Sequence, residues 1–174
     1  MPLLPGHREK DGPALDRVTA ADWEKEVREN VALARAMGRK VILGGYSVGG
    51  LISTKIATED AGIDGLILWS PAMQPRYAIE ALTNVVAPTG LTGNRLRGIP
   101  FDPEHTPYFS LKAGREVSKL AGKYHQLYGP APQEMDAMSA PLPSSSTKDV
   151  YGERLTMPVF LADAKGDDAV EVAV

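Results

Sequence analysis

The order of apolar and polar positions along the chain predicts strands that alternate with helices. Short apolar runs at residues 41–43, 65–69 and 157–162 are not broken by polar positions. Such runs are typical of strands buried on both faces of a parallel sheet. Residues 51–58 have a mixed apolar face at helical spacing, and residues 1–4 look like the end of another strand. This order predicts an α/β fold built on a mostly parallel sheet with flanking helices.

A longer helix is expected between residues 19 and 38. Thr19 can cap its first turn, Asp22 lies near the positive end of the helix dipole, and Gly38 ends the pattern. One apolar face recurs at spacings of four, four and three, formed by Trp23, Val27, Val31 and Ala34. Residues 8–18 are polar and contain glycine and proline, so they are expected to form a loop.

The composition of the sequence changes after the second predicted strand. Residues 73–152 are rich in proline, contain no strand-like run, and have helical stretches only near residues 76–85 and 111–124. We therefore divide the chain into a core at residues 1–72, an insertion at 73–152, and a final core strand with its loop at 153–174. The insertion is expected to be helical or irregular and to cover the sheet as a cap.

Composition excludes several classes of protein. The 174 residues include no cysteine, which removes disulfide scaffolds, zinc–cysteine sites and cysteine nucleophiles. The net charge of −3 argues against a nucleic-acid partner, because phosphate binding needs a clustered basic surface. No apolar run has the ~20 residues of a membrane span. The N-terminal residues do not resemble a secretory signal, so the compartment stays open with the cytoplasm favoured.

The most informative segment is the glycine-rich turn after the first strand. It contains Gly-x-Ser-x-Gly from Gly45 to Gly49, between a predicted strand and a predicted helix. This context is typical of a nucleophile elbow, in which Ser47 would be exposed on a strained turn. The backbone N–H of Val48 would then be one oxyanion donor. Tyr46 beside the serine is expected either to line a pocket or to pack in the core.

Other interpretations of this turn are weaker. A phosphate-binding loop needs lysine after its last glycine, but Leu51 follows Gly50 here. The Gly-x-Gly-x-x-Gly spacing of dinucleotide-binding turns does not occur between Gly44 and Gly50. The remaining alternative is a glycine-rich strand–helix turn whose serine has no chemical role.

With these residues in view, the chain resembles the α/β-hydrolase superfamily, in its carboxylesterase and monoacylglycerol-lipase-like branch. The resemblance covers nearly the whole chain, with the insertion matching only as a variable cap. The matching segments are Leu4-Pro5-Gly6-His7, Asp22-Trp23, the run 41–50, Ser70-Pro71-Ala72 and the run 158–170. The implied fold class is a partial α/β-hydrolase core that carries a cap insertion.

The resemblance also implies where the acid of a catalytic triad should lie. Family members place it nine residues after a proline such as Pro158, which selects Asp167. Asp168 is the runner-up, and Asp163 is less favoured because it lies at the strand end. A solvated acidic loop is the alternative for all three.

Two parts of the family pattern do not occur in this sequence. The catalytic histidine should follow the acid, yet the three histidines are His7, His105 and His125. His7 belongs to a loop beside the pocket in relatives, and the other two are expected to have surface roles in the cap. The strand and His-Gly loop that supply the second oxyanion donor also have no counterpart. We therefore expect this sequence to be an internal piece of a longer hydrolase.

For the complete enzyme, the resemblance implies hydrolysis of a small-molecule carboxylic ester through an acyl-enzyme. Ser47 would attack the carbonyl, Asp167 would orient a histidine from outside this sequence, and no metal or organic cofactor would be needed. A different hypothesis is a non-catalytic scaffold or a remnant that binds apolar ligands. A third is a partner chain that completes the sheet, so the oligomeric state stays open.

Overall fold

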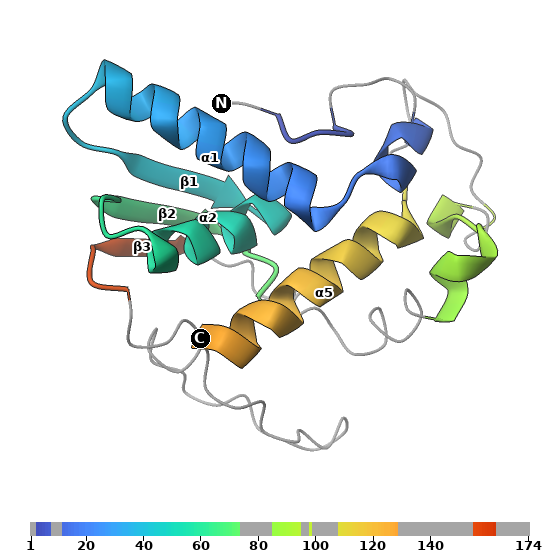
Figure 1. Cartoon of the computed structure of the whole chain (residues 1–174). Coiled ribbons are helices and arrows are strands. Elements are labelled where there is room, and N and C mark those ends of the chain that lie inside the picture. The colour runs from blue at the N-terminus through green and yellow to red at the C-terminus, as the bar shows by residue number, and fades with distance from the viewer. Residues whose placement is uncertain are drawn as a thin grey trace, which may run out of the picture.

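The computed structural model of this chain describes residues 3–7, 12–73, 85–94, 98, 108–128 and 155–162. In chain order the helices and strands are the 3₁₀ helix η1 (Gly12–Arg17), α1 (Ala20–Met37), β1 (Ile42–Tyr46), α2 (Val48–Glu59), β2 (Gly65–Trp69), the 3₁₀ helix η2 (Ala87–Thr89), α5 (Leu111–Tyr128) and β3 (Val159–Ala162). Figure 1 shows the strands side by side with α1 and α2 packed along them.

The strands of this part of the chain form a parallel sheet in the order β1-β2-β3. Tyr46 at the end of β1 is in register with Trp69 at the end of β2, which in turn pairs with Ala162 of β3. The carboxyl ends of all three strands therefore meet at one edge of the sheet. The parallel α/β architecture predicted from the sequence is confirmed.

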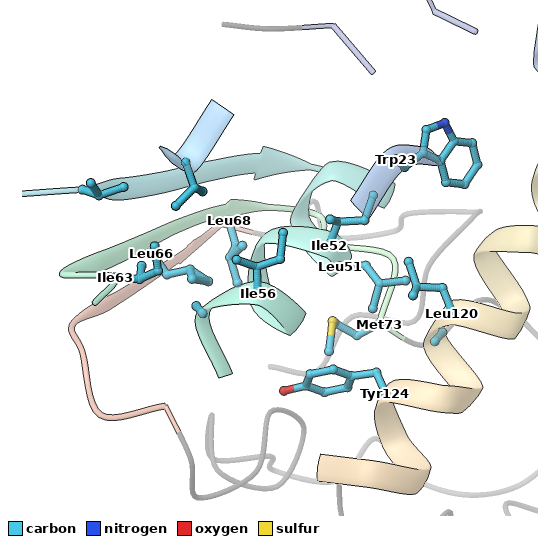
Figure 2. Packing of buried hydrophobic residues seen from close by; sticks show 14 residues of the cluster. Trp23, Leu51, Ile52, Ile56, Ile63, Leu66, Leu68, Met73, Leu120 and Tyr124 are labelled. Carbon is cyan, nitrogen blue, oxygen red and sulfur yellow. The ribbon is translucent and has the colours of Figure 1, made fainter. Parts of the chain in front are cut away.

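One face of the sheet contributes its side chains to the hydrophobic core. Its strand residues are Leu43, Leu66, Leu68, Val159 and Leu161. Helix α2 lies on this face and is buried on nearly every side, since residues 50–57 are all buried. Figure 2 shows Leu51, Ile52 and Ile56 of α2 among the core residues, with Met73, Leu120 and Tyr124 on the side of α5. The core thus joins the sheet to a helix from the expected insertion.

The opposite face of the sheet is exposed, which corrects the expectation of strands buried on both faces. Ile42, Tyr46 and Phe160 are 60%, 65% and 59% exposed. These residues alternate with the core-facing ones, because successive side chains of a strand point to opposite faces. The described helices contribute their apolar residues to the core on the other face. The apolar runs therefore predicted the strands correctly. They did not predict how many faces of each strand are covered.

Helix α1 forms for the reasons read from its sequence. The Thr19 hydroxyl accepts a hydrogen bond from the Asp22 N–H at 3.3 Å, and the Asp22 carboxylate accepts one from the Thr19 N–H at 2.9 Å. This reciprocal capping box satisfies donors that the first helical turn leaves unpaired. Trp23 and Val31 are buried, with Val27 and Ala34 partly buried against the same core. The predicted cap and apolar face are confirmed.

A buried lysine connects the two helices on the sheet. The Lys55 ammonium of α2 donates to Glu24 of α1 and to Glu59 of its own helix, both at 2.8 Å. Burial alone would lower the pKa of Lys55, but the hydrogen bonds to the two carboxylates outweigh it and the pKa is raised. The lysine is therefore charged and paired at neutral pH.

The remaining predictions from the sequence have mixed outcomes. The helix expected at 111–124 is confirmed as α5 and continues to Tyr128. The loop expected at residues 8–18 is wrong over Gly12–Arg17, which form the 3₁₀ helix η1. Leu3 and Leu4 lie in no strand, so the expectation for residues 1–4 is wrong there. The helix expected at 76–85 falls almost wholly outside the described residues.

The division of the chain at residues 73 and 152 stays a prediction. Among the described helices, none is long and apolar enough to cross a membrane.

Candidate active site

The turn between β1 and α2 consists of one residue, Ser47. Strand β1 continues through both glycines to Tyr46, and α2 begins at Val48. The expected turn over residues 44–50 is therefore too long, since the strand and the helix each take part of it. Ser47 has φ 50° and ψ −120°, a conformation that residues with a side chain rarely adopt. The local geometry is that of a sharp strand-to-helix elbow.

Close packing of backbone atoms explains two of the glycines around this elbow. A Cβ at Gly45 would come within 2.5 Å of the amide nitrogen of Gly50 and would also meet the Gly49 carbonyl. A Cβ at Gly50 would lie 2.7 Å from the Cβ of Pro71. By contrast, a Cβ at Gly49 would find no described atom within 4 Å apart from its chain neighbours and the backbone of its own helix. Gly45 and Gly50 thus let the strand, the helix and the segment after β2 approach one another.

The backbone of Ser47 is held from the end of strand β2. Its N–H donates to the carbonyl of Trp69 at 3.1 Å, and its carbonyl accepts from the N–H of Ala72 at 3.0 Å. The same carbonyl also accepts from the N–H of Leu51, one turn into α2, at 3.2 Å. Three backbone hydrogen bonds on one residue hold the strained conformation in place.

A second serine with a positive φ angle lies beside the elbow. Ser70 has φ 37°, is buried, and donates its N–H to the carbonyl of Ala162 in β3 at 2.8 Å. It redirects the chain at the end of β2 so that Ala72 reaches Ser47. The sequence analysis used Ser70-Pro71-Ala72 only as a segment that matches the family, and it assigned no role to Ser70. A serine and a proline directly after a buried strand are nevertheless a turn signal that points to this position.

Helix α5 contacts the same segment through His125. Its Nε2–H donates to the carbonyl of Met73 at 2.8 Å, and the residue is only partly exposed. The hydroxyl of Tyr124, on the same helix, lies 3.4 Å from the hydroxyl of Thr58 in α2. The surface role expected for His125 is wrong, because its ring anchors the chain that follows β2.

His7 lies against helix α1. Its Nδ1–H donates to the carbonyl of Pro5 at 3.3 Å, and its ring centroid is 6.3 Å from that of Trp23. The indole N–H of Trp23 donates to the same carbonyl at 3.0 Å. This contact joins the Pro-Gly-His loop to helix α1 at Trp23. His105 lies outside the described residues.

Two of the other predicted site residues, Val48 and Tyr46, lie in the described part of the chain. Val48 is the first residue of α2, where backbone N–H groups have no acceptor within the helix. Tyr46 lies on the exposed face of the sheet, so the expectation that it packs in the core is wrong. Asp167, Asp168 and Asp163 lie outside the described residues.

No side chain in the described part of the chain donates to or accepts from the Ser47 hydroxyl. The same residues contain no group of three or more histidine, aspartate or glutamate side chains that could hold a metal ion.

A family model described as serine aminopeptidase, S33, matches residues 15–128, which is more than half of the chain. The chain therefore belongs to this family of α/β hydrolases. No curated protein matches the sequence.

Solved structures of lipolytic enzymes share the fold. One belongs to the work on LipS and LipT, two metagenome-derived lipolytic enzymes, with 16% sequence identity and a TM-score of 0.65. It is matched over 98% of this chain and 61% of its own. Another is a soluble variant of monoglyceride lipase from Saccharomyces cerevisiae in complex with a substrate analog. That enzyme is 15% identical with a TM-score of 0.55, over 92% of this chain and 65% of its own. The chain thus spans less than two thirds of the length of either enzyme.

Proposed function

We propose that this chain carries the nucleophile of a serine hydrolase that cleaves carboxylic esters. The observation that carries the proposal is the conformation of Ser47, a serine at φ 50° on a one-residue turn between a parallel strand and a helix. A nucleophile on such a turn projects away from the backbone at the end of the sheet where a substrate can reach it. Ester substrates are favoured over peptides by the lipolytic enzymes among the structural neighbours.

The proposed first step is attack of the Ser47 oxygen on the ester carbonyl. A bond forms between the serine oxygen and the carbonyl carbon while a histidine accepts the serine proton, and the alcohol then leaves with that proton. Water attacks the acyl-enzyme in the second step and releases the acid. We assign the base to a histidine outside this sequence and its orienting carboxylate to Asp167, with Asp168 as the alternative.

The N-terminus of α2 supports the charge that develops in this reaction. Val48 is the first helical residue after the nucleophile, and its N–H would donate to the carbonyl oxygen as that oxygen becomes negative. The helix dipole adds a positive potential at the same end. The proposed nucleophile elbow consists of Ser47 and Val48 together with Gly45, Tyr46 and Gly49.

The test is hydrolysis of a short-chain ester such as p-nitrophenyl butyrate by a protein that contains this chain together with the proposed histidine. Ser47→Ala is expected to remove turnover down to the uncatalysed rate. Ser70→Ala is the matched control, because Ser70 is a nearby buried serine that also has a positive φ angle. Turnover that survives in Ser47→Ala would contradict the assignment of the nucleophile.

A second candidate is a scaffold that binds apolar ligands without turnover. It is favoured by the histidines of the described residues, since His7 and His125 bond to backbone carbonyls and neither bonds to Ser47. The experiment above separates the two candidates. No turnover by that folded protein, together with equal binding of a fluorescent fatty acid before and after Ser47→Ala, supports the scaffold.

A further inference from the structure

The peptide unit between Ser47 and Val48 links the support of the elbow to its proposed chemistry. Its carbonyl belongs to Ser47, and its N–H belongs to Val48, the first residue of α2. A peptide unit is planar, so the direction of its carbonyl also fixes the direction of its N–H. Whatever holds the Ser47 carbonyl therefore also aims the N–H that would donate to the oxyanion.

Two hydrogen bonds hold this carbonyl, and they differ in origin. The bond from the Leu51 N–H, at 3.2 Å, lies in the first turn of α2 and forms together with that helix. The bond from the Ala72 N–H, at 3.0 Å, comes from residues 70–73, which follow β2 and lie in no helix or strand. This second bond therefore depends on other contacts that keep residues 70–73 in place.

Residues 70–73 are held at both ends. The Ser70 N–H donates to the carbonyl of Ala162 in β3 at 2.8 Å, and the Met73 carbonyl accepts from the Nε2–H of His125 in α5 at 2.8 Å. Ala72 and Met73 are only 5% and 2% exposed, so water has little access to replace a lost donor. His125 thus supports the segment at the end that follows Ala72.

His125 is itself fixed relative to α2, the helix that begins at the elbow. Its neighbour Tyr124 is fully buried, and the rings of the two residues meet edge to face with centroids 5.7 Å apart. The Thr58 hydroxyl donates to the carbonyl of Thr54, which leaves its oxygen to accept from the Tyr124 hydroxyl at 3.4 Å. Figure 2 shows Tyr124 and Met73 on the same side of the core. The contacts therefore return from α2 through α5 to the segment after β2.

We propose that His125 is a positioning residue, which aims the Val48 N–H through the backbone of Met73 and Ala72. It touches no substrate and transfers no proton. The inference rests on the proposed function, because the Val48 N–H has this task only if Ser47 is the nucleophile. Since the Leu51 bond would remain, loss of His125 should cost about tenfold in kcat, less than the ~10²–10³-fold of deleting an oxyanion donor.

The test is ester hydrolysis by a protein that contains this chain together with the proposed histidine. His125→Leu should lower kcat about tenfold and leave KM unchanged, because the oxyanion contact strengthens only in the transition state. His125→Gln should recover most of kcat, since its amide N–H can replace the Nε2–H donor. His125→Asn, with a shorter amide, takes the place of His125→Leu if the leucine variant does not fold, and its kcat should then lie below that of His125→Gln.

The matched control for a purely structural effect is Val31→Ala. Val31 is buried in the core on α1 and takes part in none of the hydrogen bonds between α5 and the elbow. Its loss should lower stability and leave kcat per folded molecule unchanged, with the folded fraction measured by circular dichroism. The proposal is overturned if the His125 variant without the donor keeps its kcat, or loses no more of it than Val31→Ala.

A second readout does not depend on turnover. The backbone amide resonance of Val48 should shift more in His125→Leu than in Val31→Ala, and His125→Gln should move it back toward its original position. A parent protein without turnover would refute the proposed function, while this resonance would still decide whether His125 holds the peptide. A Val48 resonance that does not respond to His125→Leu overturns the positioning role even if Ser47 proves to be the nucleophile.

Discussion

At the scale of single residues, Ser47 owes its conformation to its neighbours and not to its own preference. A non-glycine residue in a sparsely populated region of φ and ψ costs about 1–3 kcal/mol, which the surrounding structure must offset. Here the offset comes from backbone hydrogen bonds to Trp69, Leu51 and Ala72. The elbow is thus a property of β1, α2 and the end of β2 acting together.

The two glycines of the Gly-x-Ser-x-Gly pattern are expected to differ in their tolerance of a methyl group. Gly45→Ala should destabilise the chain by about 2–3 kcal/mol, because overpacking of this size forces the backbone to shift. Its Cβ would meet the backbone of Gly49 and Gly50. Gly49→Ala should change the free energy of unfolding by less than about 1 kcal/mol, with stabilisation expected since alanine is the better helix former. Urea unfolding of both variants measures the difference, and equal losses would contradict this account of the packing.

At the scale of elements, the joint between α1 and α2 depends on the charge of Lys55. Lys55→Met retains the aliphatic length but removes the buried one of the two cations that pair with Glu24 and Glu59, and it leaves Arg28 in place. We expect a loss of about 1–3 kcal/mol, less than for a fully buried pair because the carboxylates keep some solvent contact. Lys25→Met is the control, since this exposed lysine lies 3.9 Å from Glu29 and should change stability by less than about 0.5 kcal/mol. A loss for Lys55→Met no larger than for Lys25→Met would show that the ion pairs do not matter.

Helix α5 is connected to the elbow through a chain of hydrogen bonds. His125 bonds to the Met73 carbonyl, and Ala72 next to it bonds to Ser47. His125→Ala should cost about 1–3 kcal/mol by leaving that carbonyl without its donor. It should also speed hydrogen exchange at the Ala72 N–H. Gln126→Ala is the control on the exposed side of the helix, and unchanged exchange at Ala72 in His125→Ala would break the proposed connection.

At the scale of the whole molecule, several carboxylates link stability to pH. The hydrogen bond from Arg35 and the one from the Gly62 N–H lower the pKa of Asp60 below its ordinary value of 3.8. The Thr19 hydroxyl and N–H lower the pKa of Asp22 in the same direction. A carboxylate with a lowered pKa in the folded state contributes stability above its unfolded pKa and loses it as the pH falls through the folded one.

The free energy of unfolding should therefore decrease as the pH is lowered from about 5 to about 2. Urea unfolding at several pH values in this window measures the decrease, and Asp60→Asn should make it smaller. A decrease that is the same in Asp60→Asn would show that the Arg35 pair does not contribute to it.

The sequence predicts the individual helices and strands of this molecule better than it predicts which of their faces are covered by other segments. The cap and apolar face of α1, the strand β2 and the serine elbow follow from spacing and from glycines, all of which are local signals. The exposed side of the sheet at Ile42 and Phe160 does not, because an apolar run reads the same whether one or two faces are covered.

The site was only partly predictable for a similar reason. The Gly-x-Ser-x-Gly pattern identifies the turn, but it assigns equal importance to Gly49, where a Cβ would find space, and none to Gly50, where it would meet Pro71. The roles of Ser70 and His125 depend on contacts between segments far apart along the chain. Periodicity and motif spacing contain no information on such contacts.

The most direct test of the central claim is labelling with a fluorophosphonate probe, read by peptide mass, of a protein that contains this chain together with the proposed histidine. The account predicts a label on Ser47, its loss in Ser47→Ala, and its retention in Ser70→Ala. A label on another serine, with Ser47 unmodified in a chain that circular dichroism shows to be folded, would contradict the assignment of Ser47 as the nucleophile.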